Sequence, residues 1–154
     1  MQNLTTFDPY KLLKERAALI DMKAIFNDVG KMLEVHYTDI LKRGRKREVS
    51  EARNIGIKII IDILNEHLEY ERVFGATSIS NFLGFGNHTD IIHSYKKANL
   101  LLEGDKPFIA KWQMCQHLVG KYRTELAHEI HKQKIAKDKA NSEVTKRDEL
   151  HIDC

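Results

Sequence analysis

The stretch of sequence that decides the fold is Leu83-Gly84-Phe85-Gly86-Asn87-His88-Thr89-Asp90-Ile91-Ile92-His93-Ser94-Tyr95-Lys96-Lys97. Its two glycines interrupt the chain just before Asn87, a residue that often caps the start of a helix. The pattern predicts a short helix that opens at Thr77 or Ser78, and a second helix that begins after Asn87. Two short helices around a glycine turn are typical of a helix-turn-helix, whose second helix reads DNA bases with its first residues.

The first residues of that second helix are all short and polar: Asn87, His88, Thr89 and Asp90. Each can donate to or accept from a base edge, and the threonine methyl can also contact thymine. Helix capping alone explains Asn87 and Asp90 equally well, since Asp90 is placed for a capping-box variant. Asp90 could accept from a cytosine amino group, or it could bond to the Asn87 backbone N–H and avoid DNA.

Further helices are predicted on both sides of this pair. Proline at the first position predicts a helix over 8–20, Asp21 caps a second, Thr38 caps a short third, and Asp105 opens a long helix that runs to about residue 130. The isoleucine-rich run after Ser50 favours a strand by propensity. It is too long for one and has no pairing partner, so we expect a helix over 50–67. The predicted fold class is all-α.

Positive charge is concentrated in two blocks of this 154-residue chain, whose net charge is +3. Residues 42–58 carry seven basic and two acidic side chains, and residues 93–121 carry five and two. Residues 42–47 hold five cations around Gly44, which reads as a loop. Such a run could be only a solvated loop, but beside a helix-turn-helix it favours nucleic acid as the partner.

Several classes of protein are excluded or disfavoured. The length predicts one domain, no apolar run reaches 18 residues, and the N-terminus lacks a signal-peptide pattern, so we expect a cytoplasmic protein with no membrane contact. Cys115 and Cys154 do not suggest a disulfide. No P-loop motif occurs, and His128-Glu129-Ile130-His131 lacks zinc-protease spacing. We therefore expect no ATPase module, no catalytic residues, no metal, no cofactor and no enzymatic activity.

Three strings together carry a family resemblance: the stretch from Leu83 to Lys97, the helix start Glu51-Ala52-Arg53-Asn54-Ile55, and the run Asp39-Ile40-Leu41-Lys42-Arg43-Gly44-Arg45-Lys46-Arg47. They resemble the D-H-T-T stretch, the A-R-Q-like helix start and the D-L-L plus basic loop of the C-terminal DNA-binding domain of the bacterial replication initiator DnaA. The likeness covers about residues 22–120. Asn87 replaces the family's aspartate, and Asp90 replaces its second threonine.

The resemblance implies specific contacts with double-stranded DNA. It implies that Arg45 enters the minor groove from a basic loop that includes Lys46 and Arg47. It implies that Asn87, His88, Thr89 and Asp90 face bases in the major groove. The residues that it implies near phosphates are Arg53, Asn54, His93, Lys96 and Lys97. These inferences agree with the affinity of arginine for a narrow minor groove and of cations for phosphate.

We expect an N-terminal helical extension over 1–21, a DnaA-like DNA-binding domain over 22–121, and a charged tail over 122–154 that is helical or disordered. The expected function is sequence-specific binding of duplex DNA at a DnaA-box-like site, in replication control or transcription regulation. The alternative is a protein-interaction module that kept the fold and lost base reading. In that case the acidic segment 59–92 and the charged tail would be the interaction surfaces for a protein partner.

Overall fold

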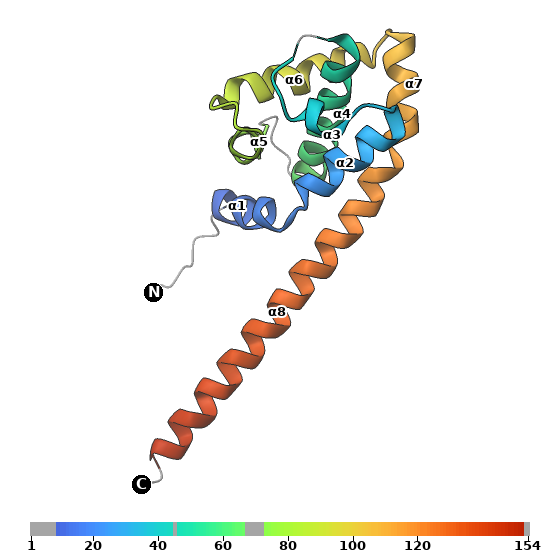
Figure 1. Ribbon diagram of the computed structural model, residues 1–154. Helices are drawn as coiled ribbons and strands as arrows, with labels where there is room; N and C mark the ends of the chain where they lie inside the picture. The colour runs from blue at the N-terminus through green and yellow to red at the C-terminus, as the bar shows by residue number, and fades with distance from the viewer. Residues whose placement is uncertain (1–8, 45, 67–72, 153–154) are drawn as a thin grey trace.

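A computed structural model describes residues 9–44, 46–66 and 73–152, and all the regular structure in these ranges is helical. Figure 1 shows a bundle of short helices at one end of the molecule, from which one long helix projects. The helices are α1 (Pro9–Leu19), α2 (Met22–Leu33), α3 (Tyr37–Ile40), α4 (Arg47–Asn65), α5 (Ala76–Leu83), α6 (His88–Leu101), α7 (Lys106–Cys115) and α8 (His117–Ile152). The all-α prediction is confirmed.

The isoleucine-rich run forms α4, the central helix of the bundle. Every residue from Glu51 to Ile61 is buried, because α2, α6 and α8 pack around α4. Gly56 permits the close approach of α2, since a Cβ there would lie 2.5 Å from Cε1 of Phe26. The run is helical despite its β-branched residues because burial on all sides outweighs their weak intrinsic preference.

Three predicted helix starts are confirmed by side-chain caps. The carboxylate of Asp21 accepts from the backbone N–H of Ala24 at 3.0 Å, and that of Asp105 accepts from Phe108 at 3.0 Å. Asn87 caps α6 through its side-chain oxygen. Each cap satisfies one of the free N–H groups at a helix start.

The other predicted caps are wrong, since each of these helices begins upstream of the predicted residue. Thr38 lies inside α3, which begins after His36. Ser50 lies one turn inside α4, where Arg47 is held by Glu51 at 2.8 Å and by Asp105 at 3.6 Å. The start of α5 is Gly75, at φ 94°, and not Thr77 or Ser78. The side chain of Asn65 bonds both the N–H and the carbonyl of Phe74, which fixes the chain just before this start.

The long helix predicted from Asp105 is divided at Gln116. The Gln116 N–H still bonds to Trp112, but the Val119 N–H donates to the Gln116 carbonyl at 3.1 Å, a tighter turn than an α-helix makes. Beyond the junction, α8 packs on α4, α7 and α1 and then continues as the long helix of Figure 1. Its side chains are exposed from residue 131 to residue 142. No helix in the described part of the chain is both long and apolar enough to span a membrane.

Candidate nucleic-acid interface

A tight turn over residues 84–87, here called the glycine turn, joins α5 to α6. The backbone N–H groups of Gly84 and Phe85 both donate to the carbonyl of Ser80, at 2.9 and 3.1 Å. Gly84 and Gly86 have φ values of 75° and 74°, in the left-handed region that glycine adopts without strain. Asn87 then accepts from the Thr89 N–H at 2.9 Å and starts α6.

The start of α6 is open to solvent, as base reading requires. All four residues from Asn87 to Asp90 are exposed, and so are His93, Lys96 and Lys97 further along the helix. Ile91 and Ala98 are buried on the opposite side. Thr89, His93, Lys96 and Lys97 are spaced by three or four residues, so they share one face of the helix. The structure therefore brings Thr89, His93, Lys96 and Lys97 together on one accessible surface, whereas His88 borders a hollow lined by α1 and α5.

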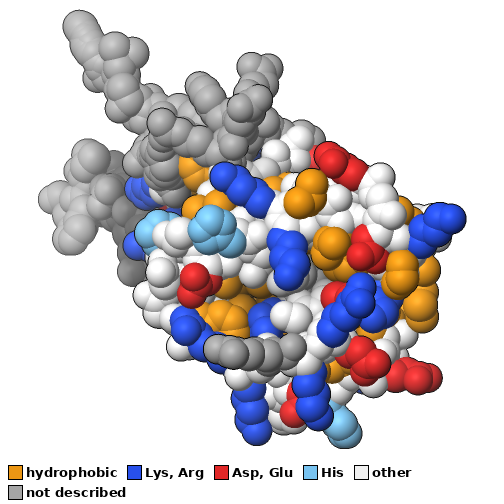
Figure 2. Space-filling view, turned by 90° about the horizontal axis from the view of Figure 1, so that it is seen from above, with side chains coloured by type: hydrophobic (Ala, Val, Ile, Leu, Met, Phe, Trp, Pro, Cys, Tyr) orange, Lys and Arg blue, Asp and Glu red, His pale blue; other side chains and the backbone are white. Residues whose placement is uncertain are grey.

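The basic loop, residues 42–46, lies between α3 and α4. Lys42, Arg43, Gly44 and Lys46 are exposed, and so is Arg47 at the start of α4. Arg45, to which the resemblance gives the minor-groove contact, lies outside the described residues. Seen from above, the end of the molecule that carries α6 shows lysine and arginine side chains spread among hydrophobic, histidine and a few acidic ones (Figure 2).

Arg43 connects the basic loop to the glycine turn. Its Nη2 donates to the carbonyl of Phe85 and lies 3.3 Å from a carboxylate oxygen of Asp90. The guanidinium also stacks over the Phe85 ring, 5.1 Å from its centre. The basic loop and the start of α6 are thus neighbours in space. In the described structure the Asp90 carboxylate meets this arginine, and no bond to the Asn87 N–H accompanies it.

Arg53 and Asn54 lie in the interior, and each is 6% exposed. The Nε of Arg53 donates to the carbonyl of Ile40 at 2.7 Å, and its Nη2 donates to that of Lys42. The guanidinium also lies 5.3 Å from the centre of the Phe85 ring. Burial lowers the pKa of this guanidinium from its ordinary value. In this structure the Arg53 guanidinium binds the backbone before and within the basic loop, and the phosphate contact that the resemblance implies stays a prediction.

Asn54 lines a hollow of about 350 Å³ together with Arg47, Ser50, Lys97 and Asp105. Arg47 is already engaged there by Glu51 and Asp105. Glu51 also binds Lys111 of α7 at 2.7 Å, so the start of α4 is tied to α7. Burial raises the pKa of Glu51, but the hydrogen bonds from Lys111 and Arg47 outweigh it and leave the pKa below its ordinary value.

Neither Arg43 nor Phe85 has a role that the sequence pattern predicts. Arg43 is one of five cations in residues 42–47, and Phe85 is part of the turn. One feature of the sequence could have pointed to a partner for Asp90. A carboxylate that faces a polyanion needs a nearby cation, and the basic loop is rich in cations. Pairing partners 47 residues apart are invisible to helical periodicity.

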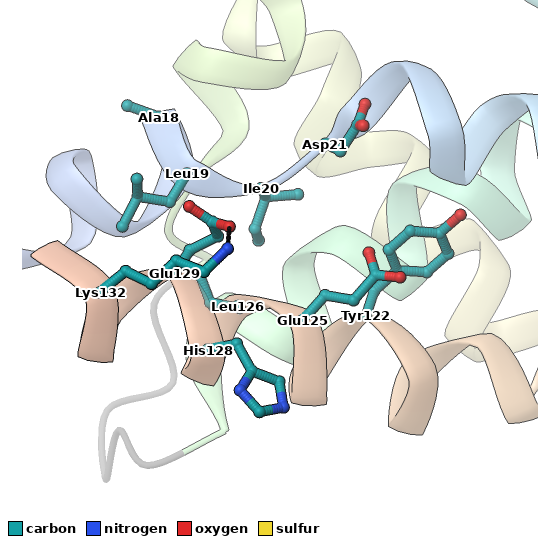
Figure 3. Close-up of a pocket in the computed structure, with 10 residues that line it drawn as sticks. All are labelled: Ala18, Leu19, Ile20, Asp21, Tyr122, Glu125, Leu126, His128, Glu129 and Lys132. Carbon is teal, nitrogen blue, oxygen red and sulfur yellow. Dashed lines mark hydrogen bonds and ion pairs between the residues drawn. The ribbon is translucent and has the colours of Figure 1, made fainter.

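A second hollow lies away from this surface, between the end of α1 and α8 (Figure 3). Its volume is about 650 Å³, and its polar lining includes Asp21, Glu125, Glu129 and Lys132. None of the described residues that the sequence predicted for DNA binding lines it. Within the described part of the chain, no group of three or more histidine, cysteine or acidic side chains could hold a metal ion.

Comparison with known proteins supports the family resemblance. The chain is 30% identical over 96 residues to the chromosomal replication initiator protein DnaA of Aliarcobacter butzleri (strain RM4018), covering 62% of this chain and 20% of that protein. It is 28% identical over 97 residues to the same protein of Campylobacter concisus (strain 13826), covering 63% and 20%. The match to Sulfurimonas denitrificans DnaA is 25% over 99 residues, 64% of this chain and 21% of the relative.

The matched part is thus about one fifth of the length of these relatives. No protein-family model matches the chain, and no solved structure matches it either. Over about 63% of its length, the chain therefore resembles the replication initiator DnaA, in the manner of that protein's C-terminal domain.

Proposed function

We propose that this chain binds double-stranded DNA in a sequence-specific manner, with α5, the glycine turn and α6 acting as a helix-turn-helix. The observation that carries the proposal is the joint placement of the exposed polar start of α6 and the exposed basic loop on one surface, linked through Arg43. The partial similarity to DnaA supports the same function.

The start of α6 supplies the base-reading groups. Asn87, His88 and Thr89 are exposed at the helix end that enters the major groove in a helix-turn-helix. Amide, imidazole and hydroxyl groups offer both donors and acceptors to base edges. The partial positive charge of a helix N-terminus also favours an approach to the anionic duplex.

Exposed cations of the basic loop and of α6 supply the phosphate contacts. Lys42 and Lys46 belong to the basic loop, Lys96 and Lys97 lie two turns into α6, and all four are exposed. Arg45 keeps the minor-groove role that the resemblance implies, since it belongs to the same loop. Contacts of this kind fix the protein on the duplex without reading its sequence.

The proposed role is control of replication or transcription at a site of the DnaA-box type, because the relatives are named as chromosomal replication initiators. The rival function, a protein-interaction module without base reading, is favoured by the acid at position 90. Arg43 pairs with that carboxylate, so its charge no longer stands unopposed at the DNA-facing end.

The proposal is tested by fluorescence anisotropy with the full chain, on duplexes that carry an initiator-type box and on random duplexes. The double variant Lys96→Ala/Lys97→Ala should weaken binding to both duplexes alike, because these lysines contact phosphates. The matched control is Lys137→Ala/Lys139→Ala, which removes two exposed lysines of α8. If the two double variants lose the same affinity for DNA, binding depends only on the overall charge of the chain, and the proposed surface is contradicted.

A further inference from the structure

We propose that Arg43 reads a guanine in the major groove and that Asp90 is the positioning residue that aims it. This inference rests on the proposed function and assigns a specificity determinant within it. The structural basis is the pairing of a basic-loop arginine with an acid in the first turn of the proposed reading helix, at 3.3 Å.

Three contacts hold the Arg43 guanidinium at this place. The Phe85 carbonyl and the Asp90 carboxylate both accept from Nη2, and the guanidinium carbon lies over the Phe85 ring, 5.1 Å from its centre. A planar guanidinium that is hydrogen-bonded and stacked has few orientations left. Because Phe85 is in the glycine turn and Asp90 is in the first turn of α6, the guanidinium sits at the helix end that a helix-turn-helix presents to base edges.

The anchored side chain keeps free donors. Both protein hydrogen bonds use Nη2, so Nη1 and Nε have no acceptor among the described residues. The side chain of Arg43 is 62% exposed and that of Asp90 is 50% exposed. A ligand can therefore reach the guanidinium without breaking its contacts with the protein.

The charge of the pair selects a base edge over a phosphate. Arg43 and Asp90 together carry no net charge, and the carboxylate would repel a phosphate placed against the same guanidinium. A neutral edge with an acceptor suits the remaining donors. Because Nη2 belongs to both paired-donor edges of a guanidinium, Nη1 supplies a single hydrogen bond, and the O6 of guanine accepts one where adenine presents an amino donor. Arg43 should consequently contribute to sequence preference and little to the salt dependence of binding, whereas Lys96 should do the reverse.

The same geometry predicts the effect of neutralising Asp90. In Asp90→Asn, the Arg43 side chain keeps its charge but loses its partner, so it is free to turn towards phosphates. Binding to random duplexes should tighten and its salt dependence should steepen by about one contact. Preference for the guanine should fall at the same time, which a mere loss of stability would not produce.

The test is a selection from randomised duplexes with the wild-type chain, Arg43→Ala, Asp90→Asn and Lys96→Ala. We expect one guanine position that the wild type enriches and that Arg43→Ala no longer distinguishes, with a loss of about tenfold in preference there. Lys96→Ala should keep that position and bind all sequences more weakly. Replacing the guanine by 2-aminopurine, which lacks O6, should weaken the wild type and leave Arg43→Ala unchanged.

The outcomes separate this inference from the proposed function. If Arg43→Ala enriches the same sequences as the wild type, the chain binds DNA but the assignment of Arg43 is overturned. If Arg43→Ala lowers affinity equally on all sequences and flattens the salt dependence, Arg43 contacts phosphate and the assignment is again overturned. If the wild type binds no duplex at low salt, the proposed function fails and the inference fails with it.

Discussion

Replacing the buried Arg53 by methionine should destabilise the protein without a selective effect on DNA. The guanidinium donates to the carbonyls of Ile40 and Lys42, stacks with Phe85, and is 6% exposed. A hydrogen bond to a charged group contributes about 1.5 to 3 kcal/mol. Methionine keeps much of the packing but leaves both carbonyls without this donor. Allowing for the relief of a buried charge, we expect a loss of about 3 kcal/mol in the free energy of unfolding.

Urea denaturation followed by circular dichroism measures this loss. With a typical dependence of about 2 kcal/mol per molar urea, the midpoint should fall by about 1.5 M. Arg53→Lys should recover little of it, because an ammonium group cannot reproduce the planar fork. The matched control is Arg123→Met, since Arg123 is half exposed and pairs with Glu66 at 2.7 Å on the surface. It should cost less than about 1 kcal/mol.

A different result would support the phosphate role that the family resemblance implies for Arg53. The structural role of Arg53 would be refuted if Arg53→Met kept its urea midpoint within the range of the Arg123 control while losing affinity for every duplex. The side chain would then have to face DNA in solution instead of the carbonyls of the loop.

Two further contacts and one buried thiol in the described structure can be tested by single substitutions. The Asn87 side chain accepts from the Thr89 N–H, so Asn87→Ala should lower the free energy of unfolding by about 1 kcal/mol. Asn87→Ser should lower it much less, because serine can also cap a helix. Equal losses in the two variants, measured by thermal or urea unfolding, would contradict the capping role. Burial raises the pKa of Asp28, but the hydrogen bonds from Tyr122 and Lys121 outweigh it and leave that pKa below its ordinary value. The ionised Asp28 therefore stabilises the fold fully above the pKa of an unfolded aspartate, about 3.9, and this stabilisation is lost as the pH falls through the lowered pKa of the folded protein. Tyr122→Phe should make the free energy of unfolding fall less steeply with acid. Parallel curves for the two proteins would contradict this coupling. Cys115 is fully buried, and burial raises its pKa to about 11. In the variant Cys154→Ser, which leaves Cys115 as the only thiol, a thiol reagent at pH 8 should therefore react only as the chain unfolds. Fast labelling of the folded chain would contradict this burial.

Local signals predicted the helices well, and the main errors lie in where three of them begin. Asp21, Asn87 and Asp105 start helices as predicted, because a side-chain cap needs only the backbone N–H two or three residues ahead. Ser50 is passed over: α4 begins a turn earlier, at Arg47, which pairs with Glu51 and Asp105. The second of these partners is distant in sequence, which a local pattern does not register.

In the candidate interface, too, features set by neighbouring residues were predictable from the sequence and contacts between distant residues were not. The exposed start of α6 was predictable from the glycine turn and the cap, which are local. The fate of the arginines was not, because residue type alone does not reveal whether a guanidinium meets a phosphate, a carboxylate or a backbone carbonyl. Arg53 binds carbonyls that lie eleven and thirteen residues upstream, and Arg43 reaches the turn 42 residues downstream.

The salt dependence of duplex binding tests the central claim most directly. Lys42, Lys46, Lys96 and Lys97 are exposed on the proposed surface, and Arg45 belongs to the same loop. About five cations at the duplex, four on phosphates and Arg45 in the minor groove, give a slope of roughly −4 to −5 in a plot of log affinity against log salt concentration. We expect this slope for the wild-type chain on random duplexes, and a slope reduced by about two in Lys96→Ala/Lys97→Ala. No binding at low salt, or a slope that this double variant leaves unchanged, would contradict the account.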